Sequence, residues 1–211
     1  MTVGETCLHP GGLDFTAKLV EDANLSRKAE ILDAGCGAGE TVIWLNEHGY
    51  KAKGLDKNQE LDAPWFMKGS LQDMPYTDSC FDAVISECTA FICGNTKAML
   101  QESFRVLRED GQLLLADVYF EEEKPLPQFN DNRPVTMNDW RMMIENSGFE
   151  IMKTEDVSAA WKPFVVEQLW AGRTLEELWG GCLAEGQINP ATYKPGYFLL
   201  RAKKKGADGN E

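Results

Sequence analysis

The sequence predicts a doubly wound α/β fold, in which a mostly parallel sheet carries helices on both faces. Apolar strand-like stretches alternate with amphipathic helix-like stretches along the 211 residues, a pattern typical of parallel sheets. The stretch from Ile31 to Thr41 adds the strongest local signal, because an apolar strand runs into three alternately spaced glycines and then a helix. At this length we expect one well-buried domain over residues 1–211.

The first half of the chain supplies the elements around this glycine turn. Residues 1–27 are expected to form a turn-rich lead-in and a helix, because Leu13 to Ala23 follow helical spacing and Asp14 suits a first turn. The elements expected next are a helix over 42–48, strands over 50–55, 65–70 and 81–86, and a helix that Asn95 caps and that runs to Leu107.

The second half continues the alternation. Arg108 to Gly111 is predicted to be a turn. The elements expected after it are a strand over 112–119, a helix over 137–146 capped by Thr136, a strand over 150–157, a helical insertion over 158–195 and a last strand over 196–202. The insertion holds Trp161, Trp170 and Trp179, which suggests an apolar core for a helical cap.

Composition excludes several classes of function. The net charge of −13 makes nucleic acid a poor partner, because nucleic-acid binding requires phosphate neutralisation by Lys and Arg. No apolar run approaches the ~18 residues of a membrane span, and the N-terminus lacks the pattern of a signal peptide, so we expect a cytoplasmic protein. The six cysteines form no C-x-x-C pair and are expected to be free thiols, with no metal site.

The spacing of the glycines indicates which ligand the turn accepts. Gly35, Gly37 and Gly39 follow a G-x-G-x-G pattern, whereas a dinucleotide fingerprint requires G-x-G-x-x-G. Asp33 and Glu40 flank the turn with negative charge, which disfavours a pyrophosphate and suits a ligand that carries an ammonium and a sulfonium. A plain strand–turn–helix without a ligand is the alternative, and an NAD-dependent oxidoreductase fits the spacing poorly.

An acid at the end of the next strand supports the ligand hypothesis. Asp56 lies at the place, roughly twenty residues after the glycine turn, where this architecture puts the partner of ribose hydroxyls. Lys57 follows it directly. Taken alone, Asp56 is equally consistent with a surface turn, but together with the glycines it predicts a nucleoside site.

Three stretches resemble the class I S-adenosylmethionine-dependent methyltransferases. The glycine turn resembles the D-x-G-x-G-x-G motif, residues 69–85 resemble the G-D-A-x-x-L-P-F…S-F-D-x-V stretch, and residues 104–117 resemble the strand-five motif. The resemblance covers about residues 28–157 and 196–204 and is closest to the quinone-biosynthesis-like branch that acts on small molecules, within an uncharacterised bacterial subgroup. It implies a Rossmann-like seven-stranded sheet of order 3-2-1-4-5-7-6 with an antiparallel last strand.

The same resemblance implies a cofactor, a product and a site. S-adenosylmethionine would donate a methyl group to an unidentified small molecule and leave S-adenosylhomocysteine. Ser70 stands where the family usually has Asp, so the backbone of Leu71 is expected to share the binding of adenine. The residues expected to bind the cofactor are Asp33, Gly35, Cys36, Gly37, Gly39, Asp56, Lys57, Ser70, Leu71 and Ser86.

The ends of strands four and five carry the candidate chemistry. Glu87 is the candidate general base, because it follows a buried strand and is expected to face the crevice; a carboxylate that only bonds backbone or cofactor is the alternative. Cys88 could instead bind a soft metalloid, as in arsenite methyltransferases, or be an inert packed thiol. His9, Cys88 and Tyr119 are the candidate substrate contacts. A non-catalytic S-adenosylmethionine-binding protein is the remaining alternative.

Overall fold

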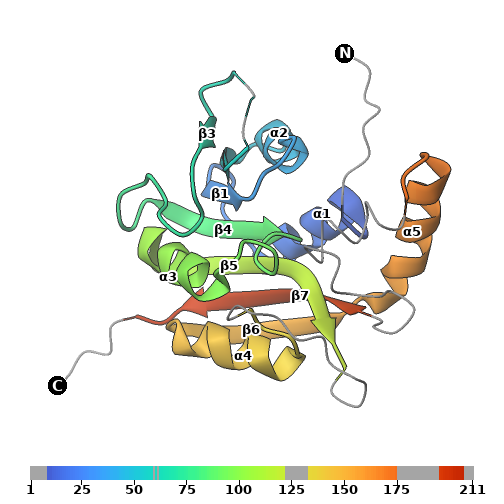
Figure 1. The fold of residues 1–211 in the computed structure, drawn as a ribbon. Coiled ribbons are helices and arrows are strands. Elements are labelled where there is room, and N and C mark those ends of the chain that lie inside the picture. Colours follow the sequence, from blue (N-terminus) through green and yellow to red (C-terminus); the bar gives the residue numbers. More distant parts are fainter. Residues whose placement is uncertain (1–8, 59, 61, 122–132, 175–194, 207–211) are drawn as a thin grey trace.

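The computed structural model describes residues 9–58, 60, 62–121, 133–174 and 195–206. It contains a seven-stranded sheet of order β3-β2-β1-β4-β5-β7-β6, with helices packed on both faces (Figure 1). This arrangement confirms the predicted fold class and the predicted strand order.

Each predicted element within the described residues is present, with small shifts at its ends. The strands are β1 (Glu30–Ala34), β2 (Lys51–Asp56), β3 (Phe66–Lys68), β4 (Phe81–Glu87), β5 (Leu107–Phe120), β6 (Phe149–Asp156) and β7 (Pro195–Lys204). The helices are α1 (Gly12–Ala23), α2 (Glu40–Glu47), α3 (Thr96–Val106), α4 (Met137–Asn146), the short η1 (Ser158–Ala160) and α5 (Trp161–Trp170).

The strand directions define where a ligand can bind. β1 pairs in parallel with β2 and β4, and β4 pairs in parallel with β5. β7 runs antiparallel to both β5 and β6, as expected for the last strand. The carboxyl ends of β1, β2, β4 and β5 therefore meet at one edge of the sheet, where open α/β sheets bind their ligands. We call this the carboxyl edge.

The predicted turn at residues 108–111 is part of β5 rather than a loop before it. Phe81 pairs with Leu107 and Ala83 pairs with Gln112, so the four residues between the two partners bulge out of the ladder. Arg108 stabilises the bulge, because its guanidinium donates to Asp82 Oδ1 at 2.7 Å and to Glu30 Oε2 at 3.2 Å. The prediction missed this pairing because a bulge contains the same residue types as a turn.

The capping residues predicted for two helices are confirmed. Asn95 Oδ1 accepts from the N–H of Ala98 and so begins α3. At α4, Thr136 and Asp139 form a complete capping box, in which each side chain accepts from the backbone N–H of the other residue. These caps hold the helices that cover the β5–β7–β6 side of the sheet.

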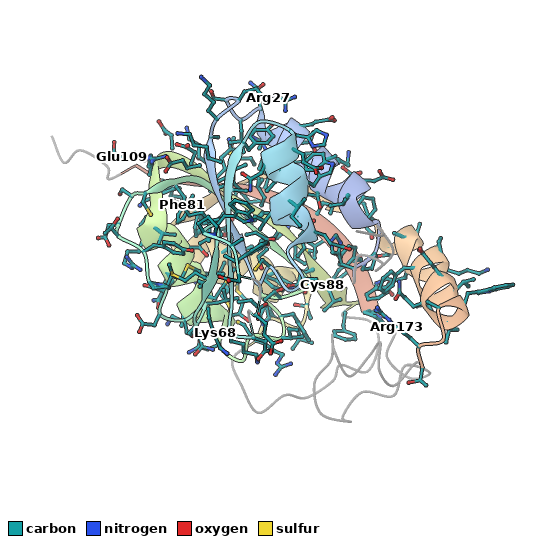
Figure 2. The ribbon with its side chains drawn as sticks, turned by 90° about the horizontal axis from the view of Figure 1, so that it is seen from above. Arg27, Lys68, Phe81, Cys88, Glu109 and Arg173 are labelled. Atoms are coloured by element: carbon teal, nitrogen blue, oxygen red, sulfur yellow. The ribbon has the colours of Figure 1, made fainter. Side chains whose placement is uncertain are left out.

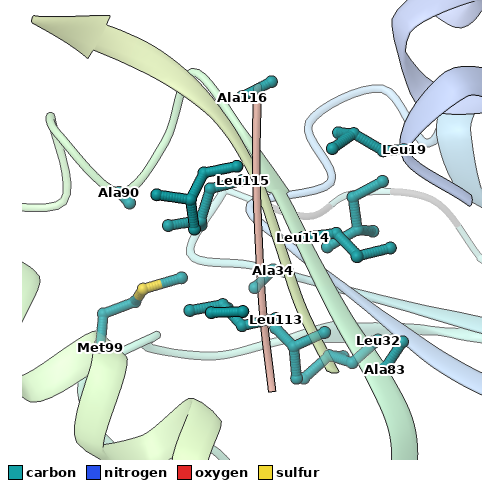
Figure 3. Close-up of a cluster of buried hydrophobic side chains, with 14 of the residues drawn as sticks. Leu19, Leu32, Ala34, Ala83, Ala90, Met99, Leu113, Leu114, Leu115 and Ala116 are labelled. Atoms are coloured by element: carbon teal, nitrogen blue, oxygen red, sulfur yellow. The ribbon is translucent and has the colours of Figure 1, made fainter. Parts of the chain in front are cut away.

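A single hydrophobic core joins the sheet to its helices. Ile31 and Leu32 of β1 and the run Leu113–Ala116 of β5 are fully buried, as expected for strands covered on both faces (Figure 3). Trp140 of α4 is also fully buried, and its indole N–H donates to the carbonyl of Val118 at 2.9 Å. Polar side chains lie instead at the carboxyl edge, outside this core.

Only part of the predicted insertion over 158–195 can be compared with the structure. η1 and α5 confirm that it begins with helix, and β7 already starts at Pro195. Residues 175–194, with Trp179 and Cys182, lie outside the described residues. Within the described part of the chain, no helix has the length and apolar character that crossing a membrane requires.

Candidate active site

The glycine turn leaves open space for a ligand at one position. Gly35 is needed for packing, because a Cβ there would lie 2.2 Å from the side chain of Thr89. Gly37, at φ +47°, differs, since a Cβ there would meet no protein atom within 4 Å. Gly39 also has a positive φ, and it precedes α2 directly. The backbone around Gly37 is therefore the part of the turn that a ligand can approach closely.

Asp56 at the end of β2 is joined to this turn. Its Oδ2 accepts from the N–H of Gly37 at 3.1 Å, and its Oδ1 accepts from the N–H of Asn58 at 2.8 Å. Lys57, between them in sequence, is exposed. The two features that the sequence suggested independently, the glycine spacing and the acid after the second strand, thus form one structural unit.

Asp33 places a buried carboxyl at the base of the turn. Its side chain is buried at the end of β1, and burial raises the pKa of this carboxyl well above its ordinary value, with further contributions from the charges of Glu87 and Asp56. A cation bound beside Asp33 would favour its ionised form. A ligand with an ammonium and a sulfonium group would therefore stabilise the ionised carboxyl of Asp33.

Other candidate cofactor residues have contrasting surroundings. Ser86 is fully buried, and its hydroxyl has no hydrogen-bond partner among the described residues, so a ligand group could complete it. Ser70 is exposed, and its Oγ accepts from the N–H of Gln72 at 3.1 Å, while Leu71 is buried. Cys36 is buried too, with its sulfur 2.6 Å from where a Cβ on Gly54 would lie.

Glu87 is not exposed to an open crevice, which corrects the expectation from the sequence. Its side chain is 4% exposed. The hydroxyl of Thr16 donates to Oε1 and Oε2 at 3.0 and 3.1 Å, and the hydroxyl of Thr41 donates to Oε2 at 3.0 Å. His9 Nε2 lies 3.7 Å from the same Oε2. His9, α1 and α2 thus enclose the carboxylate at the end of β4, which a local pattern does not reveal.

The threonines were missed as site residues, although the sequence contains a signal for each of them. Thr16 lies on the face of α1 that carries Leu19, Val20 and Ala23, so helical spacing would have placed a hydroxyl among apolar side chains. Thr41 is in the first turn of the helix after the glycine turn, where a side chain is close to the ligand position. His9, one of the candidate substrate contacts, is buried beside them.

Cys88, the residue after β4, contacts a different element from Glu87. It has a positive φ of 51°, and its thiol donates to the hydroxyl of Tyr197 at 3.4 Å. Burial raises the pKa of Tyr197 well above its ordinary value, and the neighbouring Cys88 adds to this shift. Tyr197 of β7 was not identified from the sequence, because a tyrosine in an apolar strand is usually a packing residue.

The described residues do not favour a metalloid site at Cys88. Within the described ranges, no group of three or more His, Cys, Asp or Glu side chains could hold a metal ion. The thiol of Cys93 donates to the carbonyl of Ala90, and burial raises its pKa. Cys182, the other candidate thiol, lies outside the described residues.

Tyr119 lies at the end of β5, close to the start of β7. A Cβ on Gly196 would lie 2.3 Å from its ring, so the glycine allows the ring to approach the backbone. Burial is the main cause of a raised pKa for its half-buried phenol. The structure brings Tyr119 to the same edge as Cys88 and Tyr197 through the pairing of β5 with β4 and β7.

Comparison with known proteins identifies the kind of enzyme that has this site. A family model described as a methyltransferase domain matches residues 32–115, which include the glycine turn, Asp56 and Glu87. The uncharacterized methyltransferase YodH of Bacillus subtilis (strain 168) is 28% identical over 172 residues, or 71% of each chain. The chain is an S-adenosylmethionine-dependent methyltransferase. Asp33, Gly37 and Asp56 of the methyltransferase all lie within the matched residues, and the N–H of Gly37 donates to Asp56.

Solved structures share the fold of this methyltransferase. The cyclase SpnF has a TM-score of 0.73 at 22% identity, over 92% of this chain and 82% of that chain. Geranyl diphosphate C-methyltransferase from Streptomyces coelicolor A3(2), solved with S-adenosyl-L-homocysteine, has a TM-score of 0.71 at 12% identity, over 92% and 79% of the two chains. At these identities the similarity shows the fold alone, and one fold can support different reactions.

Asp117 of the methyltransferase is a buried carboxyl that connects β5 to the segment after β4. Its Oδ2 accepts from the N–H of Phe91 at 3.0 Å and its Oδ1 from the N–H of Val118 at 2.8 Å. Burial raises its pKa from 3.8 to about 7. Between these two values the folded protein keeps a proton that the unfolded chain releases, so raising the pH lowers the stability of the fold.

Replacing Asp117 by asparagine is expected to remove this pH dependence. The protonated carboxyl of Asp117 stabilises the folded state fully below pH 3.8, and this contribution is lost as the pH rises to about 7. It amounts to at most about 4 kcal/mol of unfolding free energy. Urea unfolding at pH 5 and pH 8 should show the Asp117→Asn variant gaining stability relative to the wild type at the higher pH. Parallel pH profiles for the two proteins would mean that Asp117 does not titrate in this range.

Proposed function

We propose that the methyltransferase transfers a methyl group from S-adenosylmethionine to a small organic molecule at the carboxyl edge. One observation carries this proposal: the open space at Gly37 lies next to two acids, Asp56 and the buried Asp33. When bound, S-adenosylmethionine supplies an activated methyl group on a positively charged sulfur. The residues of the chain then have to hold donor and acceptor in line, which can be worth effective molarities of about 10⁵–10⁸ M.

Each group of the cofactor has a candidate partner in this site. Asp33 would balance the positive charge at the methionine end, and Asp56 would accept from the ribose hydroxyls. The unpartnered hydroxyl of Ser86 is a further candidate contact. Ser70 and Leu71, in the loop after β3, would hold the adenine.

We further propose that Glu87 is the catalytic proton acceptor when the methyl acceptor arrives protonated. Thr16 and Thr41 fix its carboxylate by donating two hydroxyl hydrogens. A carboxylate can accept about four hydrogen bonds, so capacity remains for another donor. His9, with Nε2 at 3.7 Å, is the neighbouring group through which an acceptor proton could reach Glu87. Catalytic hydrogen bonds often shorten only when the substrates are bound.

The cofactor assignment predicts a strong effect at Asp56. Losing two charge-assisted bonds to the ribose should cost on the order of 2–4 kcal/mol of binding free energy, so Asp56→Ala should bind S-adenosylmethionine far more weakly. Calorimetric titration measures this change. Glu47→Ala is the matched control, because it removes an exposed carboxylate at the end of α2. Equal affinities for Asp56→Ala and wild type, with both proteins folded, would refute the assignment.

The identity of the acceptor can be tested by a direct screen. Purified protein and radiolabelled S-adenosylmethionine should be incubated with quinols, phenols, amines, thiols and arsenite in parallel. Transfer to an organic acceptor supports the proposal. Transfer to arsenite alone would support the metalloid alternative at Cys88, and cofactor binding without transfer to any acceptor would support a non-catalytic binding protein.

A further inference from the structure

Gln168 of α5 is a buried polar side chain whose hydrogen bonds the described fold does not complete. It is 1% exposed, and neither the oxygen nor the nitrogen of its carboxamide has a hydrogen-bond partner among the described residues. Its neighbours Glu167 and Leu169 are exposed. Leaving a buried donor and acceptor unsatisfied costs stability, so such a group calls for an explanation, and a ligand that completes its hydrogen bonds provides one.

The buried face of α5 carries aromatic residues as well as Gln168. Trp161, Phe164 and Gln168 are spaced by three and four residues, so they share one side of the helix. The ring of Trp161 lies 6.0 Å from that of Phe164 and 5.7 Å from that of Tyr197, between centroids. Gln168 is thus on the same side of α5 as the ring that contacts β7.

This face belongs to the carboxyl edge of the sheet. Tyr197 accepts the thiol hydrogen of Cys88, which follows the last residue of β4. Figure 1 shows α5 at the side of the molecule to which the arrow of β4 points, and Figure 2 places Cys88 on that side. The inner face of α5 therefore adjoins the region in which we place the methyl acceptor.

The side chains around this region suggest the chemistry of a ligand. Phe15 of α1 stacks on Tyr197 at 6.4 Å, and both Phe15 and Trp161 are only partly buried, so their rings offer an apolar wall. Aromatic walls suit a flat apolar molecule. A carboxamide is uncharged and offers one acceptor oxygen and two N–H donors. A hydroxyl group can use both functions, because it accepts from the amide nitrogen and donates to the amide oxygen.

We propose that Gln168 binds the hydroxyl group of an uncharged aromatic methyl acceptor. This inference rests on the proposed function, because it places the acceptor beside the methyl donor. The aromatic body of the acceptor packs against the partly exposed rings of Trp161 and Phe15, and its hydroxyl satisfies the amide of Gln168. A charged acceptor is disfavoured there, because a neutral amide does not compensate a buried charge.

Binding measurements with two matched probes test the inference. Hydroquinone carries two hydroxyls, whereas 1,4-dimethoxybenzene has the same ring and no O–H donor. Each is titrated by calorimetry into full-length protein saturated with S-adenosylhomocysteine, using wild type, Gln168→Leu and the matched control Glu167→Leu. We expect Gln168→Leu to weaken hydroquinone binding about tenfold, as the loss of two neutral hydrogen bonds implies. Binding of 1,4-dimethoxybenzene and of S-adenosylhomocysteine should not change, and Glu167→Leu should behave as wild type.

Thermal unfolding of the unliganded proteins provides a second, independent measurement. Removing an unsatisfied buried amide should raise the melting temperature of Gln168→Leu, whereas a residue needed for packing would lower it. Gln168→Met, which keeps the length of the side chain, replaces the leucine variant if the latter does not fold.

Three outcomes would overturn the inference. They are a lower melting temperature in both Gln168 variants, unchanged hydroquinone affinity in those variants, and a wild type that binds S-adenosylhomocysteine but does not bind hydroquinone. A wild type that binds hydroquinone but not S-adenosylhomocysteine would instead contradict the proposed function. The two proposals can therefore fail separately.

Discussion

Replacing Gly37 by valine is expected to abolish binding of S-adenosylmethionine while the protein stays folded. A Cβ at this position meets no protein atom within 4 Å, so the new side chain enters only the space that we assign to the cofactor. Valine is also strained at φ +47°, and strain of this kind costs about 1–3 kcal/mol. Calorimetric titration with S-adenosylmethionine and circular dichroism measure the two effects separately.

Gly49→Val is the control that separates strain from lost binding. Gly49 also has a positive φ, +87°, and open surroundings, but it precedes β2 and so lies at the end of the sheet opposite the carboxyl edge. This variant should lose a similar amount of stability and retain cofactor affinity. If Gly37→Val bound the cofactor as the wild type does, the glycine turn would have a purely structural role.

Replacing Glu87 by glutamine should lower methyl transfer far more than replacing Cys88 by serine. A general base typically contributes 10²–10⁴-fold to the rate, and glutamine cannot take a proton. Cys88, in contrast, donates to Tyr197, and serine can keep that hydrogen bond. The turnover number of each variant with the best acceptor from the screen, and its affinity for S-adenosylmethionine, measure the two effects.

Thr16→Val serves as a graded control for Glu87. It removes one hydroxyl that donates to the carboxylate but keeps the carboxylate itself, so it should reduce turnover less than Glu87→Gln does. Should Cys88→Ser be inactive and Glu87→Gln active, with transfer to arsenite or a thiol in the wild type, the metalloid hypothesis would replace ours.

The sequence alone determined the fold and singled out Gly37 and Asp56, the two residues at the centre of our proposed cofactor site. Alternating strands and helices predicted the layers, and Asn95 and Thr136 marked helix starts correctly, because capping depends on residues only three positions apart. The family resemblance supplied the strand order. Gly37 and Asp56 could be paired in advance because a strand–turn–helix–strand unit brings the ends of neighbouring parallel strands together.

The surroundings of Glu87 were decided only by the tertiary structure. Its hydrogen-bond donors Thr16 and Thr41 lie 71 and 46 residues away in the chain, and His9 joins them from the lead-in. Local periodicity places each of these residues on its own element but does not state which elements pack over the end of β4. The sequence therefore predicted that Glu87 faces an open crevice, whereas in the structure its carboxylate is enclosed.

The same holds for the unsatisfied amide of Gln168. In the sequence, Gln168 is one of three polar residues of α5, with Lys162 and Glu167. Helical spacing groups it with Trp161 and Phe164 without showing which side of α5 is buried. The contact between Trp161 and Tyr197 of β7, 36 residues further along the chain, shows which side of α5 faces the sheet. Contacts at this separation follow from how whole elements pack, since the free energy of burial depends on total apolar area rather than on any local pattern.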